Sequence, residues 1–142
     1  MKPTLKPGLK HKFSYVVPEN KTVPYTYPES AEISAMPKVF ATGYMIVLME
    51  WTCIQLMAPH LDAGEGSLGV QVDVSHSAAT LPSMTVTVEA ECVEVSGRKL
   101  TFKVRAHDGV DVIGEGTHGR AVVAWDKFNS RVAEKAKLAG VA

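Results

Sequence analysis

Residues 39–58, VFATGYMIVLMEWTCIQLMA, are apolar on nearly every side of a helical projection, and a single carboxylate, Glu50, interrupts them. A run of this length and pattern predicts one long helix. Thr42 is a suitable N-cap, because its hydroxyl can accept a hydrogen bond from a free amide of the first turn, and Pro59 marks the end. A helix that is apolar all round has to be enclosed. We therefore expect a central helix that carries one acidic side chain into an apolar environment.

Beyond a turn at residues 62–66, the apolar positions recur every second residue, which is typical of strands with one buried face. The dipeptides Ser96-Gly97 and Asp108-Gly109 are hairpin turn signals between consecutive strands. Asp126 is placed to cap a short amphipathic helix. The elements predicted outside the central helix are an extended segment at 13–17, strands at 70–77, 85–92, 100–106 and 112–125, and a terminal helix at 127–138.

An antiparallel sheet with one apolar face is a suitable cover for an apolar helix. The order of the elements predicts an α+β fold of the hot-dog type, in which a curved antiparallel sheet wraps around one long central helix. No internal repeat or linker suggests a second domain, so residues 1–142 are expected to form a single domain.

The composition, 46% hydrophobic and 21% charged, is that of an ordinary globular protein. Fifteen basic residues balance fifteen acidic ones, and no basic cluster interleaves with aromatic residues, which argues against a nucleic-acid surface. No apolar run reaches the ~18–20 residues that a membrane span needs, and no signal peptide is recognised, so no membrane partner is expected. Cys53 and Cys92 are far apart and are interpreted as buried free thiols, which favours a cytoplasmic location.

Two segments, residues 64–69 and 114–119, match the GxGxxG dinucleotide pattern. A pyrophosphate site requires these glycines to follow a strand and open a helix. The first segment follows a helix and opens a strand, and the second lies inside a strand, so neither is interpreted as a nucleotide site. Glycines in strands more often mark bulges or a close approach of two backbones. The sequence has no G-x-S-x-G motif and no metal-ligand spacing of histidines.

Glu50 and His76 form a candidate chemical pair. By alternation, His76 shares the face of Val70, Val72 and Val74, which should cover the helix. A buried carboxylate without a partner is strongly unfavourable or takes up a proton. A histidine on the covering strand could orient that carboxylate or share its proton, and the alternative is a purely structural ion pair.

Thr42 and Arg120 are two further candidates. Thr42 precedes Glu50 by eight residues, so the two lie about 12 Å apart along one helix. Either the first turn is irregular, or the site is assembled between two subunits. Arg120 follows Gly119 on the last strand, and its alternative interpretation is a solvated guanidinium at a sheet edge.

The sequence resembles the hot-dog-fold thioesterase family, and within it the fluoroacetyl-CoA thioesterase branch, from about residue 7 to residue 135. The similar segments are 27–30, 39–43, 48–51, 57–59, 64–69, 107–111 and 116–118. The resemblance implies a homodimer that hydrolyses a short acyl-CoA thioester, and the substrate expected first is fluoroacetyl-CoA.

In that branch the catalytic threonine, glutamate and histidine fall on Thr42, Glu50 and His76. The amide associated with the thioester carbonyl falls on Gly69, and a supporting arginine falls on Arg120. Glu50 would act as general base or nucleophile, Thr42 would position or attack the thioester, and the amide would stabilise the oxyanion. An acyl intermediate on either side chain and direct attack by water both remain open. Neither a metal nor an organic cofactor is required.

Met36 is the one departure, because the fluoroacetyl-specific enzyme has a phenylalanine lid residue at this substrate-binding position. Methionine is apolar but more flexible than phenylalanine, so the resemblance supports thioester hydrolysis more strongly than selectivity for fluorine. One alternative is a general short-chain acyl-CoA thioesterase without preference for fluorine. Another is a non-catalytic acyl-CoA binding module on the same fold. The combined presence of Thr42, Glu50 and His76 favours an enzyme.

Overall fold

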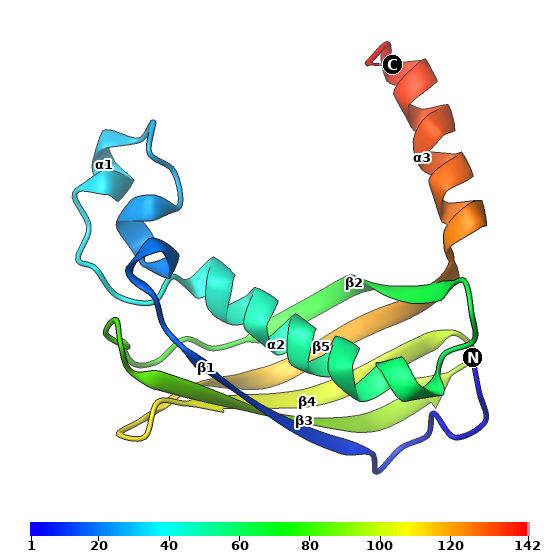
Figure 1. Ribbon diagram of the computed structural model, residues 1–142, viewed down its shortest axis with the longest axis horizontal. Coiled ribbons are helices and arrows are strands. Elements are labelled where there is room, and N and C mark those ends of the chain that lie inside the picture. The colour runs from blue at the N-terminus through cyan, green and yellow to red at the C-terminus, as the bar shows by residue number, and fades with distance from the viewer. Residues whose placement is uncertain (142) are drawn as a thin grey trace.

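The structure, a computed structural model, describes residues 1–141. Five antiparallel strands form one sheet in the order β1-β3-β4-β5-β2, and α2 (Thr42–Met57) lies across one face of it (Figure 1). The strands are β1 (Lys10–Val16), β2 (Glu65–Val74), β3 (Thr85–Ser96), β4 (Lys99–His107) and β5 (Val112–Ala124). The other helices are α1 (Ala31–Ser34), α3 (Trp125–Ala139) and three 3₁₀ turns at Glu19–Lys21, Val23–Tyr25 and Ala58–His60. The predicted hot-dog architecture is confirmed.

The central helix α2 turns one stripe of side chains towards the sheet. At spacings of three and four residues, it buries Met45, Leu48, Met49, Thr52, Cys53, Leu56 and Met57. The N-cap is Ala41 and no side chain caps the helix, so the prediction of Thr42 as N-cap is wrong. The hydroxyl of Thr42, in the first helical residue, is instead bonded to His76. The helix ends at Met57, two residues before Pro59, as predicted.

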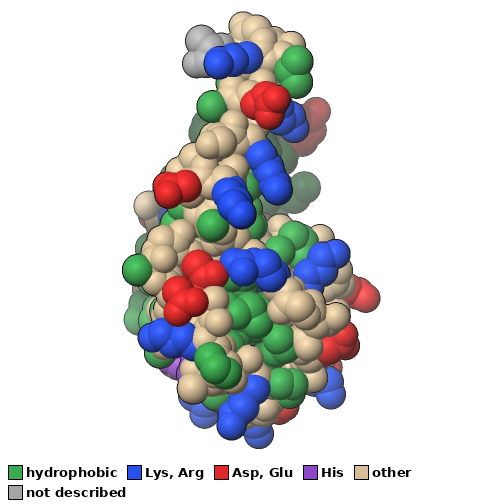
Figure 2. Space-filling model, turned by 90° about the vertical axis from the view of Figure 1, so that its right-hand side faces the viewer, with side chains coloured by type: hydrophobic (Ala, Val, Ile, Leu, Met, Phe, Trp, Pro, Cys, Tyr) green, Lys and Arg blue, Asp and Glu red, His purple; other side chains and the backbone are tan. Residues whose placement is uncertain are grey.

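The opposite face of α2 is not covered. Val47, Trp51 and Ile54 follow each other at helical spacing and are 54%, 44% and 42% exposed. A single chain therefore encloses the helix on one side only, contrary to the expectation of complete enclosure. In Figure 1, α3 and the segment that holds α1 rise on the same side as this face and leave it open between them. Figure 2 shows α3 as a projection from the body that carries charged side chains of both signs.

The sheet buries its inner face by strict alternation along β3 and β4. The inward side chains, all at most 3% exposed, are Val86, Val88, Ala90, Cys92, Leu100, Phe102, Val104 and Ala106. The turns from β3 to β4 and from β4 to β5 fall at the predicted dipeptides. Gly97 and Gly109 adopt φ values of +61° and +88°, which favour glycine over residues with a side chain.

Strand β2 departs most from the predicted pattern. It begins at Glu65, and the prediction that its valines cover the helix is wrong for Val70 and Val72, which are 57% and 45% exposed. The register shifts between Gly69 and Gln71, which marks a bulge. Because β2 is also an edge strand, its bulge can redirect side chains without disturbing a further neighbour.

His76 lies just beyond the end of β2 at Val74, but its backbone remains fixed to β5. The amide of Ser75 donates to the Glu115 carbonyl oxygen at 2.9 Å, and the amide of Ser77 donates to the Ile113 carbonyl oxygen at 2.7 Å. The two hydrogen bonds on either side of His76 hold it at a defined place beside the sheet.

The glycines of the 114–119 segment allow β2 and β5 to approach each other closely. A Cβ atom on Gly114 would lie 2.4 Å from the Ser75 carbonyl oxygen, and one on Gly116 would lie 2.0 Å from the Asp73 carbonyl oxygen. The segment lies within β5, as predicted, and does not open a helix.

Helix α3 follows β5 without an intervening loop. Its N-cap is Ala124 with no side-chain hydrogen bond, so the prediction of Asp126 as the cap is wrong, and this residue lies in the first turn instead. A carboxylate at that place still interacts favourably with the helix dipole. Among residues 1–141, none of the helices combines the length and the apolarity that a membrane crossing requires.

Candidate active site

Glu50 forms an ion pair with Arg120 inside the chain. The Arg120 Nη1 donates to Glu50 Oε2 at 2.9 Å, and the two side chains are 3% and 28% exposed. The carboxylate therefore has a partner, and its incomplete burial reflects the open face of α2. The interpretation of Arg120 as a solvated guanidinium is wrong, because the side chain points inward from β5.

Hydrogen bonds on several sides hold the guanidinium of Arg120. Its Nε donates to Ser67 Oγ at 2.8 Å, and its Nη2 donates to the Ser67 carbonyl oxygen at 2.9 Å. The third nitrogen, Nη1, faces both Glu50 and His118. The planar fork of an arginine fits such an arrangement, whereas a lysine could not reproduce it.

His118 is a member of this cluster that the sequence interpretation did not select. Its side chain is 2% exposed, and its Nε2 lies 3.1 Å from Arg120 Nη1 and 3.7 Å from Glu50 Oε2. The sequence did contain a signal for this role: His118 precedes Arg120 by two residues on one strand, and residues with this spacing share a face of the sheet.

Gly69 brings the backbone of β2 directly against the carboxylate. A Cβ atom at Gly69 would lie 2.4 Å from Glu50 Oε2 and 3.3 Å from His118 Cε1. Gly69 is opposite Arg120 in the strand register and borders the bulge. Any side chain at this position would collide with the carboxylate.

Thr42 and His76 form a second cluster. Thr42 Oγ1 lies 2.7 Å from His76 Nδ1. The Nε2 of His76 is buried and has no hydrogen-bond partner among the described residues. Burial lowers the pKa of His76 below its ordinary value, which favours the neutral ring. A neutral imidazole beside a hydroxyl can take the hydroxyl proton during a reaction.

The expected pairing of His76 with Glu50 does not occur within one chain. His76 bonds to Thr42 at the start of α2, whereas Glu50, two turns further along, faces His118 and Arg120. Alternation placed His76 towards the helix, but the strand ends before this residue. The predicted separation of Thr42 and Glu50 holds, since both lie in the regular helix α2.

Met36 lies in the segment between α1 and α2 and is 50% exposed. Its backbone amide donates to the Ile33 carbonyl oxygen at 3.0 Å. The structure thus places Met36 on an accessible segment shortly before Thr42.

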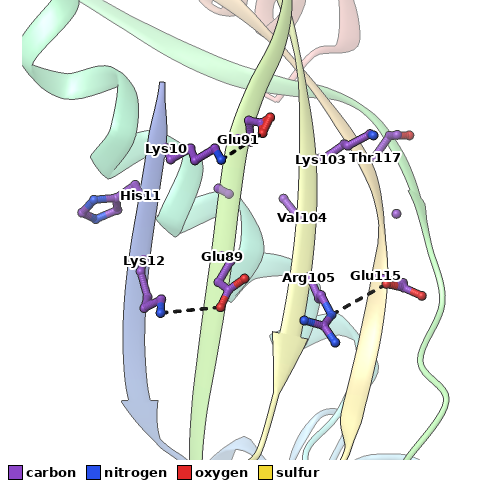
Figure 3. A pocket seen from close by; sticks show the side chains of 12 residues that line it. Lys10, His11, Lys12, Glu89, Glu91, Lys103, Val104, Arg105, Glu115 and Thr117 are labelled. Atoms are coloured by element: carbon purple, nitrogen blue, oxygen red, sulfur yellow. Dashed lines mark ion pairs between the residues drawn. The ribbon is translucent and has the colours of Figure 1, made fainter. Parts of the chain in front are cut away.

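Two grooves lie away from the candidate residues. One, of about 810 Å³, runs over the outer face of the sheet, where the ion pairs Lys10–Glu91, Lys12–Glu89 and Arg105–Glu115 cross between strands (Figure 3). The other, of about 620 Å³, extends from Ile54 to Trp125 and includes Ser67. Neither groove is lined by Thr42, Glu50 or His76. Within residues 1–141, no three side chains of His, Cys, Asp or Glu gather as a metal site would require.

Comparisons with known proteins agree on one family. The family model described as fluoroacetyl-CoA-specific thioesterase matches residues 19–126, which include all six candidate positions. A fluoroacetyl-CoA thioesterase of Streptantibioticus cattleyicolor is 53% identical over 135 residues, which are 95% of this chain and 97% of that protein.

Solved structures give the same result. A structure of a fluoroacetyl-CoA thioesterase has a TM-score of 0.90 at 53% identity, and the match covers 92% of this chain and 97% of that chain. A thioesterase superfamily member from Thermus thermophilus is 26% identical, with a TM-score of 0.87 and complete coverage of both chains.

Proposed function

This chain belongs to the fluoroacetyl-CoA-specific thioesterase family, and we propose that it hydrolyses fluoroacetyl-CoA to fluoroacetate and CoA. A shared fold does not by itself establish an activity, so the proposal has to rest on the site. The contact that carries it is the 2.7 Å distance between Thr42 Oγ1 and His76 Nδ1. It supplies a hydroxyl nucleophile and the base that activates it.

The proposed reaction begins with attack of Thr42 Oγ1 on the thioester carbonyl carbon. The Nδ1 of neutral His76 takes the hydroxyl proton, and the C–S bond breaks as this proton passes to the sulfur of CoA. Water then cleaves the threonyl ester, which releases fluoroacetate and restores the hydroxyl. A backbone amide of Gly69, from the subunit that supplies Glu50 to the site, stabilises the developing oxyanion, a contribution of ~3 kcal/mol for a well-placed donor.

We also propose that the active protein is a homodimer. Two observations support it: the open apolar face of α2 and the unpartnered Nε2 of His76. When Nδ1 accepts a proton from Thr42, Nε2 carries a hydrogen that needs an acceptor. In the proposed dimer, Glu50 of the partner subunit supplies that acceptor.

Mixing of inactive variants tests this arrangement. Thr42→Ala and Glu50→Gln protomers would be unfolded together, refolded and assayed. If each site combines one half from each protomer, random pairing restores about one quarter of the native sites, because half of the dimers are mixed and each has one intact site. Thr42→Ala mixed with His76→Ala is the control and should restore nothing. Absence of recovery in the first mixture, despite mixed dimers, would exclude shared sites.

Thiol release from fluoroacetyl-CoA and from acetyl-CoA tests the function itself. We expect hydrolysis of both, with a higher kcat/KM for fluoroacetyl-CoA. Equal values would favour the general short-chain thioesterase, and binding without thiol release would favour the non-catalytic module. We place the protein in the cytoplasm, because its two cysteines, Cys53 and Cys92, are free and buried.

A further inference from the structure

His118 has both ring nitrogens engaged, and this fixes its tautomer. Its Nδ1 lies 2.8 Å from the Gln71 carbonyl oxygen, and its Nε2 lies 3.1 Å from Arg120 Nη1. A carbonyl oxygen only accepts hydrogen bonds and a guanidinium only donates them. Nδ1 therefore carries the hydrogen, and Nε2 presents its lone pair to Arg120.

The surroundings keep this ring uncharged. Burial is the main cause that lowers the pKa of His118. The groups that face it are Arg120 on its own strand, Glu50 on α2 and the Gln71 carbonyl on β2. Cys53, one turn beyond Glu50, stays neutral because burial raises the pKa of its thiol to about 12. A protonated ring would point a second N–H at the cationic Arg120 and lose its role as acceptor.

The neutral ring of His118 contacts two parts of the candidate site: Arg120, which bonds to Glu50, and the bulge of β2 that follows Gly69. Its Nε2 accepts a hydrogen bond from Arg120 Nη1, the nitrogen that also donates to Glu50. Through the Gln71 carbonyl oxygen it holds the bulge of β2, and its Cε1 would lie 3.3 Å from a Cβ atom at Gly69.

We propose that His118, as the neutral Nδ1–H tautomer, is a positioning residue that sets the Glu50 carboxylate through Arg120 and the Gly69 amide through the β2 bulge. This rests on the proposed thioesterase function. His118 makes no hydrogen bond to Thr42, His76 or Glu50, so its removal should lower kcat by misplacing other groups and leave KM nearly unchanged. A misplacement of about 1 Å can reduce a rate by up to about 100-fold.

The first test compares two substitutions. His118→Leu removes both hydrogen-bonding functions, whereas His118→Gln can place an amide oxygen near the Nε2 position to accept from Arg120. We expect kcat to fall at least about tenfold in His118→Leu and to recover to within about threefold of native in His118→Gln. Circular dichroism and thermal melting control for folding. Equal losses in both folded variants, or no loss in His118→Leu, would overturn the proposal.

A double-mutant comparison separates positioning from a general structural role. In a Glu50→Gln background, His118→Leu should reduce the residual rate by a clearly smaller factor than in the native background, because the carboxylate that it positions is already gone and only its effect on the Gly69 amide remains. The same factor in both backgrounds would indicate a structural role only.

The tautomer can be measured without any activity. In protein labelled with ¹⁵N-histidine, His118 should show a protonated Nδ1 and an unprotonated Nε2 at pH 7, and His118→Gln identifies the signal. A proton on Nε2 would contradict the proposal even if His118→Leu failed to fold. If native protein hydrolyses no acyl-CoA while this tautomer is observed, the thioesterase proposal fails and the assigned geometry of His118 stands.

Discussion

Arg120 donates one hydrogen bond to Glu50 at 2.9 Å while three of its other N–H groups bond to Ser67 and His118. The pair joins the central helix α2 to β5, and only the arginine is fully buried. The carboxylate is therefore both a candidate reacting group and the counter-charge of a buried cation.

Glu50→Gln should affect activity much more than stability. The amide oxygen can still accept from Arg120, but the buried guanidinium loses its counter-charge, so we expect a loss of about 1–3 kcal/mol in the free energy of unfolding. Combining it with Arg120→Met, which removes the buried cation, should recover part of this stability and none of the activity. Urea unfolding and thiol release measure the two effects, and full activity in Glu50→Gln would refute a catalytic role.

Thr42→Ala should remove most of the activity with little effect on folding, because Thr42 is exposed and does not cap the helix. We expect the free energy of unfolding to change by less than about 0.5 kcal/mol. Thr42→Ser is the matched control, since it keeps the hydroxyl that bonds to His76. If Thr42→Ser loses as much activity as Thr42→Ala, then the hydroxyl is not the reacting group.

Gly69→Ala should inactivate the protein by displacing the Glu50 carboxylate, because the added methyl group would lie 2.4 Å from its Oε2. Gly43→Ala is the control for folding, since a Cβ atom there meets nothing within 4 Å. Gly43 lies in the first turn of α2, so this second change should leave stability unchanged or raise it by less than about 1 kcal/mol. Near-native kcat in Gly69→Ala would show that the close approach of the carboxylate is unimportant.

Stability should decrease as the pH falls below about 6.5. Burial lowers the pKa values of both His76 and His118, whereas both return to about 6.5 when the chain unfolds. Below that pH the unfolded chain binds more protons than the folded chain, so each histidine reduces the free energy of unfolding by at most about 1.4 kcal/mol per pH unit. The decrease continues down to the pKa values of the folded protein. Unfolding in urea at several pH values should show a shallower slope for His118→Gln, and an unchanged slope would exclude this histidine as a source.

The alternation of apolar residues predicted β3 and β4 well, because both strands are interior to the sheet and bury one face. It was misleading for β2, an edge strand with a bulge after Gly69, where Val70 and Val72 are largely exposed. A pattern with period two contains no information about a register shift. The sequence also presented Glu50 as isolated, since the spacing of residues along the chain does not show that Arg120 crosses to α2.

The chemical types at the candidate site were predictable, but their pairing was not. His76 was expected to face Glu50, yet it bonds to Thr42, and His118 lies near Glu50 instead. Two histidines that point to the same side of a sheet are equivalent in the sequence. Only the ends of the strands and the twist of the sheet determine which part of α2 each one reaches.

Met36→Phe should change the choice between substrates more than it changes stability or the rate-limiting chemistry. Met36 is half exposed on the segment before α2, where the fluoroacetyl-specific enzymes resembled by this sequence have an aromatic residue. A fluorine atom adds little to binding, because pocket differences of about one methylene group are worth only ~1–3 kcal/mol. A rigid aromatic side chain should discriminate between the two acyl groups better than a flexible thioether.

We expect Met36→Phe to raise the ratio of kcat/KM for fluoroacetyl-CoA over acetyl-CoA, with an unchanged melting temperature. Met36→Leu, which is apolar and of similar size, is the control and should leave the ratio near its native value. A ratio that does not respond to Met36→Phe would remove this residue from the acyl-binding wall.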